Sequence, residues 1–296
     1  MRLAWSGRRA LAVLALCAAC AAPGSSPVEP REISVVGLDY AFQLPAELPA
    51  GWVTFRFRNA GKVPHEFNIS LLKPDATVQQ FIAAANEDRP VTPLRDATIG
   101  VLFAEPGGDS PSGLTTELLP GRTYVVHCIF RDREGAPRHH ALGMYSELRV
   151  TTAPSPVVAA PRIDTITGMD YAYRAPATLP AGVHYLAFVN EGAQRHQLTV
   201  TLLRAGVAVQ QFMDAELAER DVAEMVESDL GLLHSPGRTT PRGLLRVDLL
   251  PGREYLLECA FADSDSAPPH FRLGMYGSIR VDGAPAPAER RTSGGR

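Results

Sequence analysis

The chain has 296 residues, a formal net charge of −3 and four cysteines. Because the charge is nearly balanced, there is no basic surface of the kind that nucleic acid requires, and this class of partner is excluded. Its length predicts two domains after an N-terminal export segment. Beyond that segment, no hydrophobic run approaches the roughly 20 residues that span a membrane.

Residues 1–21 have the composition of an export signal. The basic stretch MRLAWSGRR precedes the short apolar stretch ALAVLALCAAC, and small residues follow. This pattern predicts a periplasmic or otherwise extracytoplasmic protein. Two forms stay open. Cleavage after Ala19–Ala21 gives a freely secreted protein, and lipidation of Cys20 gives a lipoprotein that touches the membrane only through this anchor.

The rest of the chain is a duplication. A shift of 131 residues aligns GLDYAF with GMDYAY, VQQF with VQQF and LLPGRTY with LLPGREY. The repeats are predicted to be domains of residues 33–150 and 163–282. A linker rich in Pro and Ala joins them at 151–162, and a disordered tail follows at 283–296. We expect each repeat to form its own sandwich around a similar core.

Short stretches of alternating apolar residues dominate both repeats. Pro, Gly and Asn separate these stretches, which is the pattern of half-buried β-strands. One passage in each repeat is helical, TVQQFIAAANE in the first and AVQQFMDAELAERDVAEMV in the second. The predicted fold is all-β, with two tandem Greek-key β-sandwiches that each carry a short helical insertion. The predicted strand stretches are 52–59, 66–72, 122–130, 146–150, 184–190, 197–203, 253–261 and 278–282.

Each repeat holds one cysteine, followed at matched distances by a histidine and a methionine. Because Cys17 and Cys20 lie in the export segment, each domain has a single cysteine without a disulfide partner in its own repeat. This leaves either a buried inert thiol or a thiolate metal ligand. A further histidine stands at the start of a strand in both repeats. The matched pairs are His65 and His196, Cys128 and Cys259, His139 and His270, and Met144 and Met275.

Two imidazoles, one thiolate and one thioether form a donor set that suits copper. A trigonal site of two His and one Cys with a weak axial Met lets copper change oxidation state with little rearrangement, which favours electron transfer. Zinc accepts the same atoms, but its structural sites prefer Cys and His pairs without methionine. A metal-free alternative stays open, in which the cysteines and methionines fill the core and the histidines are hydrogen-bonded.

These segments resemble the cupredoxin, or blue copper, family. FRNAGKVPHEF is similar to the plastocyanin segment with the first histidine ligand, and YVVHCIF with APRHHALGMYSELRV is similar to the Cys, His and Met ligand loop. The likeness covers residues 33–150 and 164–281. It implies type 1 copper at up to two sites, held by the four matched pairs, and either electron transfer with redox partner proteins or copper carriage. His139 is preferred to His140 because only His139 aligns with His270.

The chain departs from small cupredoxins in two respects. The second histidine follows the cysteine by eleven residues, a longer step than in plastocyanin-like proteins. In addition, Glu66 and Gln197 follow the first histidine, where the family usually has Asn. This change predicts weaker hydrogen bonding around the ligand loops.

The sequence predicts that the chain is not an enzyme. By the family resemblance, a catalytic copper would need a histidine where Ser70 stands, five residues after His65, and His127 has no partner set. His184 and His234 lie outside the repeated set, so surface or packing roles are expected for them. The alternative to a copper protein is a metal-free cupredoxin-like module for binding or assembly.

Overall fold

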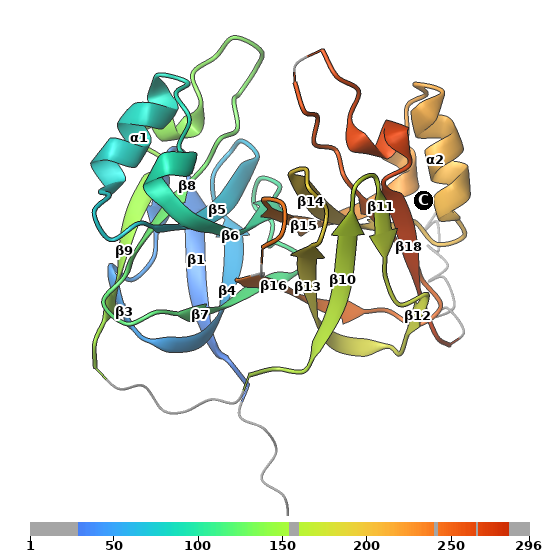
Figure 1. Cartoon of the computed structure of the whole chain (residues 1–296), viewed down its shortest axis with the longest axis horizontal. Coiled ribbons are helices and arrows are strands. Elements are labelled where there is room, and N and C mark those ends of the chain that lie inside the picture. The colour runs from blue at the N-terminus through green and yellow to red at the C-terminus, as the bar shows by residue number, and fades with distance from the viewer. Residues whose placement is uncertain (1–28, 154–159, 240–241, 265, 284–296) are drawn as a thin grey trace, which may run out of the picture.

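A computed structural model describes residues 29–153, 160–239, 242–264 and 266–283 of the chain (Figure 1). The predicted export signal, the centre of the linker and nearly all of the predicted tail lie outside these residues. Within the described part, no helix is both long and apolar enough to cross a bilayer.

The first repeat contains strands on both sides of one α-helix. Its elements are β1 (Arg31–Leu38), β2 (Ala41–Gln43), β3 (Glu47–Pro49), β4 (Gly51–Asn59), β5 (His65–Leu72), α1 (Val78–Asn86), β6 (Arg95–Ala104), β7 (Gly113–Leu118), β8 (Thr123–His127) and β9 (Tyr145–Thr151), with the 3₁₀-helices η1 (Thr92–Leu94) and η2 (His139–Leu142).

The second repeat follows the same order. Its elements are β10 (Ile163–Met169), β11 (Ala172–Arg174), β12 (Thr178–Leu179), β13 (Gly182–Asn190), β14 (His196–Leu203), α2 (Val209–Leu217), β15 (Val226–Ser235), β16 (Gly243–Leu249), β17 (Glu254–Glu258) and β18 (Tyr276–Val281), with the 3₁₀-helices η3 (Ala223–Met225) and η4 (His270–Leu273).

Two sheets pack face to face and run through both repeats. One has the order β11-β10-β13-β16-β7-β4-β1-β2, and the other β12-β18-β17-β14-β15-β6-β5-β8-β9-β3. The strands of the two repeats do not interleave, and both orders are palindromic under the repeat, so a pseudo-twofold axis relates the two sandwiches. The predicted all-β class and the tandem sandwiches are confirmed.

The sandwiches join edge to edge at a seam. In the smaller sheet β7 pairs with β16, with Leu114 opposite Leu245, and in the larger sheet β6 meets β15 where Val101 faces Leu232. Leu114 and Leu245 are fully buried in a single apolar cluster that contains residues of both repeats. The expectation of a core for each repeat is corrected, because neither edge is left open to water and both bury their apolar side chains against the other repeat.

Helix α1 covers the outer face of the larger sheet. All eight residues of β5 are buried, and Leu72 at the end of the strand packs in the apolar cluster under the helix with Val125 of β8. The helix begins at a capping box in which the Thr77 hydroxyl accepts from the Gln80 amide and the Gln80 side chain accepts from the Thr77 amide. Its buried face contains Val78, Phe81, Ile82 and Ala84. The neighbouring Ala85 is half-buried.

Candidate metal centres

The turn before the first histidine is fixed by a buried amide. Asn59 donates to the carbonyl oxygens of Val63 at 2.8 Å and Ala104 at 3.0 Å, and its Oδ1 accepts from the Gly61 amide. This anchor delivers His65 as the first residue of β5, at one end of the sandwich. Asn190 makes the same three bonds before His196 in the second repeat.

Backbone hydrogen bonds hold the end of the long loop next to the cysteine. The amide of His139 donates to the Phe130 carbonyl at 2.8 Å, that of Cys128 to the Met144 carbonyl at 3.2 Å, and that of Met144 to the His139 carbonyl at 2.9 Å. The eleven-residue step is thereby closed by a short 3₁₀-helix. The loop of Cys259, His270 and Met275 closes with the same bonds, and both loops rise at the top of Figure 1.

Three donor atoms converge in each repeat. In the first, Nδ1 of His65 lies 3.1 Å from Nδ1 of His139, which lies 3.4 Å from the Cys128 sulfur. In the second, the corresponding distances are 2.9 Å and 3.5 Å, between His196, His270 and Cys259. Each set of donor atoms lies within 4.8 Å of one another, and all six side chains are buried. Two of the predicted histidines and the cysteine are thus brought together twice.

The methionines occupy the same end of each sandwich. Met144 and Met275 are fully buried, and their backbones bond to both the cysteine and the histidine of the loop. Two glycines leave space for these side chains. A Cβ atom at Gly37 would lie 3.4 Å from the Met144 methyl group and 3.0 Å from the Phe57 ring, and a Cβ atom at Gly168 would lie 3.2 Å from the Met275 methyl group. Both methionine side chains are therefore buried and closely packed, on backbone that bonds to the cysteine and the histidine of the same loop.

The histidine nitrogens that face away from the cysteine meet carboxylates. Nε2 of His139 lies 3.0 Å from Asp132, and Nε2 of His196 lies 3.0 Å from Asp170. The contacts of His65 with Asp39, at 3.6 Å, and of His270 with Asp263, at 3.3 Å, are longer. For His139 and His196, the carboxylate on Nε2 favours the tautomer that carries the proton there, so that their Nδ1 lone pairs point into the centre. Nε2 of His65 and of His270 is buried without a hydrogen-bond partner among the described residues.

A tyrosine covers each carboxylate pair. Tyr40 donates to Asp132 at 2.6 Å and its ring packs edge-on against His139, with centroids 5.2 Å apart. Tyr171 donates to Asp263 at 3.3 Å and packs in the same way on His270. Both tyrosines have positive φ angles, 63° and 64°. This conformation is costly for a residue with a side chain, and it is repeated at the tight turn that also carries Asp39 or Asp170.

Both groups fit a copper cofactor. The donor set of two nitrogens and one sulfur is soft, and it is shielded from water. Burial and the charge of Glu66 raise the pKa of the Cys128 thiol to about 12, and burial raises the pKa of Cys259. A cation would compensate the charge of the buried thiolates, which gives the chain up to two copper sites. When bound there, copper supplies one-electron chemistry.

No protein-family model matches the chain, and neither does any curated protein. Solved structures do match. Auracyanin from Roseiflexus castenholzii is 23% identical over 42% of this chain and 97% of its own, with a TM-score of 0.29. The fold of this chain and its two His-Cys-His groups agree with the resemblance seen in the sequence. The chain has a cupredoxin-like fold.

Other matches extend across both cupredoxin-like repeats. A multicopper oxidase is 13% identical over 85% of this chain and 89% of its own, with a TM-score of 0.24. A Cu-containing nitrite reductase from Thermus scotoductus SA-01 is 11% identical over 88% and 64%, with a TM-score of 0.24. Both of these proteins are enzymes. The expectation that the chain is not an enzyme is therefore wrong, because this fold also occurs in enzymes.

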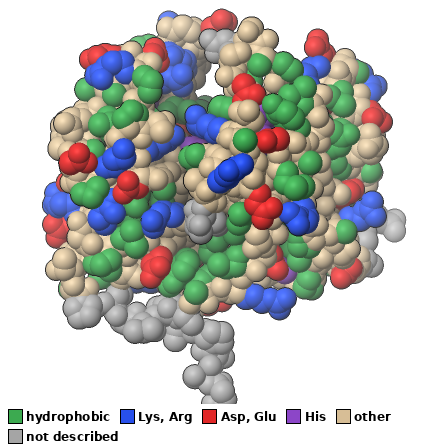
Figure 2. All heavy atoms as spheres, in the orientation of Figure 1, with side chains coloured by type: hydrophobic (Ala, Val, Ile, Leu, Met, Phe, Trp, Pro, Cys, Tyr) green, Lys and Arg blue, Asp and Glu red, His purple; other side chains and the backbone are tan. Residues whose placement is uncertain are grey.

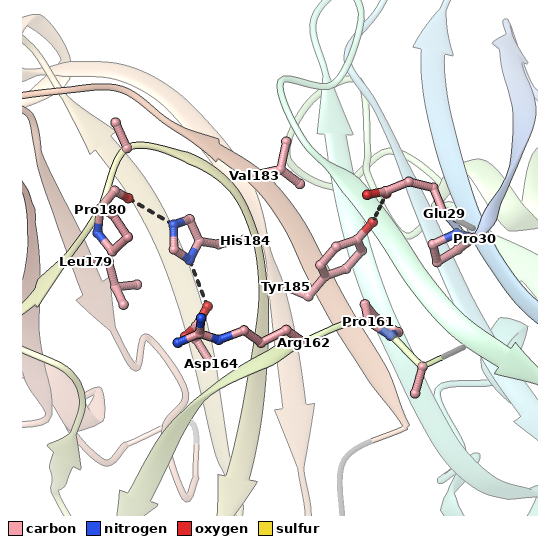
Figure 3. A pocket seen from close by; sticks show the side chains of 12 residues that line it. Glu29, Pro30, Pro161, Arg162, Asp164, Leu179, Pro180, Val183, His184 and Tyr185 are labelled. Carbon is pink, nitrogen blue, oxygen red and sulfur yellow. Dashed lines mark hydrogen bonds and ion pairs between the residues drawn. The ribbon is translucent and has the colours of Figure 1, made fainter. Parts of the chain in front are cut away.

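The remaining histidines are placed outside the donor groups. His140 bonds through Nδ1 to Asn86 at 2.7 Å, which leaves His139 as the loop histidine of the centre. His127 lies under α1, its ring 5.1 Å from Phe81. In a cavity of about 640 Å³, His184 bonds to Asp164 and to the Pro180 carbonyl, so both of its nitrogens are engaged (Figure 3).

Glu66 ties two ligand segments together. Its carboxylate accepts from the Ile129 amide at 3.0 Å, and its own amide points to the Cys128 sulfur at 3.4 Å. Gln197 keeps only the second contact, and its side chain turns to Thr199. The predicted loss of hydrogen bonding therefore applies to the second repeat alone.

The carboxylates and tyrosines of the two centres were not predicted from the sequence. A pattern was available, because Asp39, Tyr40 and Asp132 coincide with Asp170, Tyr171 and Asp263 under the shift of 131. What they contact becomes visible only in three dimensions.

Proposed function

We propose that this protein is an exported cupredoxin that binds copper at type 1 sites and passes single electrons to and from redox partner proteins. The carrying observation is the convergence of two imidazole nitrogens and one cysteine sulfur, twice, beside a buried methionine. The proposed ligands are His65, Cys128, His139 and Met144 in the first centre, and His196, Cys259, His270 and Met275 in the second.

The surroundings suit fast one-electron exchange. The donors are held by buried backbone bonds on the Asn59 and Asn190 anchors and on the closed loops, so little needs to move when the charge of the ion changes. Asp132 and Asp170 fix the tautomers of His139 and His196, and all four carboxylates lie at the surface. Tyr40 and Tyr171 are half-buried and contact both a carboxylate and a ligand histidine, which makes them the proposed contacts for a redox partner.

Export rests on residues 1–21, with an extracytoplasmic location for the mature chain. Lipidation at Cys20 would hold it at a membrane surface, and cleavage without lipidation would release it. Mass spectrometry of the protein from its native envelope distinguishes a diacylglyceryl cysteine from an unmodified N-terminus.

Copper titration of the purified mature chain tests the proposal. We expect saturation at two equivalents, with an intense visible band from thiolate-to-copper(II) charge transfer that disappears on reduction. Zinc should compete for the sites without giving a band. A chain that takes up no copper would be a metal-free module instead, and copper bound without the band would place the ion away from the cysteines.

A further inference from the structure

The seam between the repeats contains two clefts that the pseudo-twofold axis relates. One is a cavity of about 120 Å³ lined by Arg95, Arg195 and His234, with Thr92, Thr98 and Asp96 among its other residues. The equivalent cleft, about 290 Å³, is lined by Glu105, Asp109, Glu227 and Asp229. The fold therefore sets the position of the clefts but not their charge.

The basic residues of the first cleft have no charged counterparts in the other. Under the shift of 131, Arg95 corresponds to Val226, Arg195 to Pro64 and His234 to Phe103. The larger sheet forms without charges at these positions, so stability of the fold does not explain them. In the space-filling view, Lys and Arg side chains lie beside a hollow between the two repeats (Figure 2).

Neither arginine is neutralised within the described part of the chain. No carboxylate there lies within ion-pair distance of Arg95 or Arg195. The one acid that lines the cavity, Asp96, is paired with Arg122 at 2.5 Å. Burial and the charge of Arg195 lower the pKa of Arg95 to about 10. Arg195 is exposed and Arg95 half-buried, so two unpaired guanidinium groups give the cavity a positive charge that an anion would offset.

We propose that this cleft binds a small oxyanion, with inorganic phosphate as the test ligand. A guanidinium offers parallel N–H donors that match two oxygens of a tetrahedral anion, and charge-assisted bonds of this kind are the strong ones. The hydroxyl groups of Thr92 and Thr98 supply further donors at the cavity wall.

The site also contacts the surroundings of the second metal centre. The Arg195 guanidinium stacks on the Phe261 ring at 4.7 Å, and that ring packs 5.6 Å from the ligand His270. Arg195 also directly precedes the ligand His196. An anion on Arg195 would offset its charge next to this centre, a consequence that rests on the proposed copper function.

Calorimetry on the metal-free mature chain tests the site independently of copper. At constant ionic strength, we expect one equivalent of phosphate to bind the parent. The double variant Arg95→Gln and Arg195→Gln should bind at least a hundredfold more weakly, about tenfold for each lost charged bond. His234→Phe, which installs the residue of the other cleft, should weaken binding about threefold.

A matched double variant controls for the change in net charge. Arg174→Gln and Arg280→Gln removes two exposed arginines that pair with Glu191 and Glu254 away from the cavity. It should bind phosphate within twofold of the parent. Absence of saturable binding by the parent, or equal weakening by both double variants, would overturn the site. Circular dichroism confirms that each variant is folded.

The coupling has a separate measurement. Copper is loaded into Cys128→Ser, which leaves only the second centre, and into Cys259→Ser, which leaves only the first. Phosphate should shift the visible band in the former and not in the latter. Phosphate binding with no shift would refute the coupling, whereas the absence of any band would refute the proposed function and leave the calorimetric result standing.

Discussion

The two metal centres have the same donors and the same backbone bonds but different neighbours. In the first centre, the short carboxylate contact is made to His139 of the loop, and in the second it is made to His196 at the start of β14. The longer contact falls on the opposite histidine in each case. Donor identity thus follows from the duplicated fold, and the electrostatic environment follows from individual side chains.

The thiols differ as well. Burial raises the pKa of Glu66 to about 7, so above that pH it adds negative charge beside Cys128, whereas Gln197 is neutral at the equivalent position. Burial raises the pKa of Cys259, and Tyr173, which donates to the Gln197 carbonyl, opposes this increase, while Phe42 stands at this position in the first repeat. Glu258 acts in the other direction as a smaller influence on Cys259. The second centre therefore favours its thiolate more than the first.

Removal of a carboxylate should have the largest effect on copper affinity and should make the two centres differ most. Asp132→Asn should weaken copper binding at the first centre by about 10–100-fold, the usual cost of losing the hydrogen-bond partner of a ligand histidine. Asp39→Asn serves as the matched control and should have a smaller effect, since its contact is 3.6 Å long. Competition with a copper chelator measures both. Equal losses in the two variants would contradict the inequality of the contacts.

Exchange of the residues at positions 42 and 173 sharpens the comparison of the thiols. Tyr173→Phe removes a polar hydroxyl next to Cys259, so thiolate donation to copper(II) strengthens and the reduction potential of the second centre should fall by roughly 60 mV, a tenfold change for one electron. Phe42→Tyr should raise the potential of the first centre. Spectroelectrochemistry in the single-centre Cys→Ser backgrounds measures each shift, and an unchanged potential in both variants would refute the role of the hydroxyl.

Glu66→Gln should make the first centre resemble the second. Removal of the negative charge beside Cys128 destabilises copper(II) more than copper(I), so the reduction potential of the first centre should rise by about 30 mV. The reverse variant, Gln197→Glu, should lower that of the second centre. A fall in potential on Glu66→Gln would show that its bond to the Ile129 amide matters more than its charge.

Replacement of the methionines by leucine should have the smallest effect on copper binding. Met144→Leu and Met275→Leu keep the packing volume and remove only the axial thioether, so copper should be retained at two equivalents with an affinity loss under about tenfold. Equilibrium dialysis against a chelator measures it. Loss of a full equivalent of copper would make the thioether a principal ligand.

Sequence patterns predicted much of each sandwich but not the joint between the two. WVTFRFRN and EFNISLL became β4 and β5 because the alternation of apolar and polar residues along the chain is a local signal, although every residue of β5 is buried. The seam strands β6, β7, β15 and β16 were not among the predicted stretches, and their pairing depends on the contact of two edges far apart in sequence. The shared core therefore could not be predicted.

The donors were predictable and their partners were not. A histidine, cysteine and methionine at matched spacing are chemically distinctive, so the repeat alone singled them out as candidates, and the structure brings the histidines and the cysteine together in each repeat. Asp132 and Asp39 are common surface residues on separate turns, and nothing in their spacing shows that both reach the same pair of imidazoles. A shift of 131 shows that they recur, but only the folded chain shows what they contact.

Copper stoichiometry across the cysteine variants tests the central claim most directly. The mature parent, Cys128→Ser, Cys259→Ser and the double variant are loaded with copper, freed of excess metal, and measured for bound copper and visible absorption. Two centres built on these thiols predict two, one, one and no equivalents, with the band falling in the same proportion. Copper retained by the double variant at the stoichiometry of the parent would place the metal elsewhere and contradict the account.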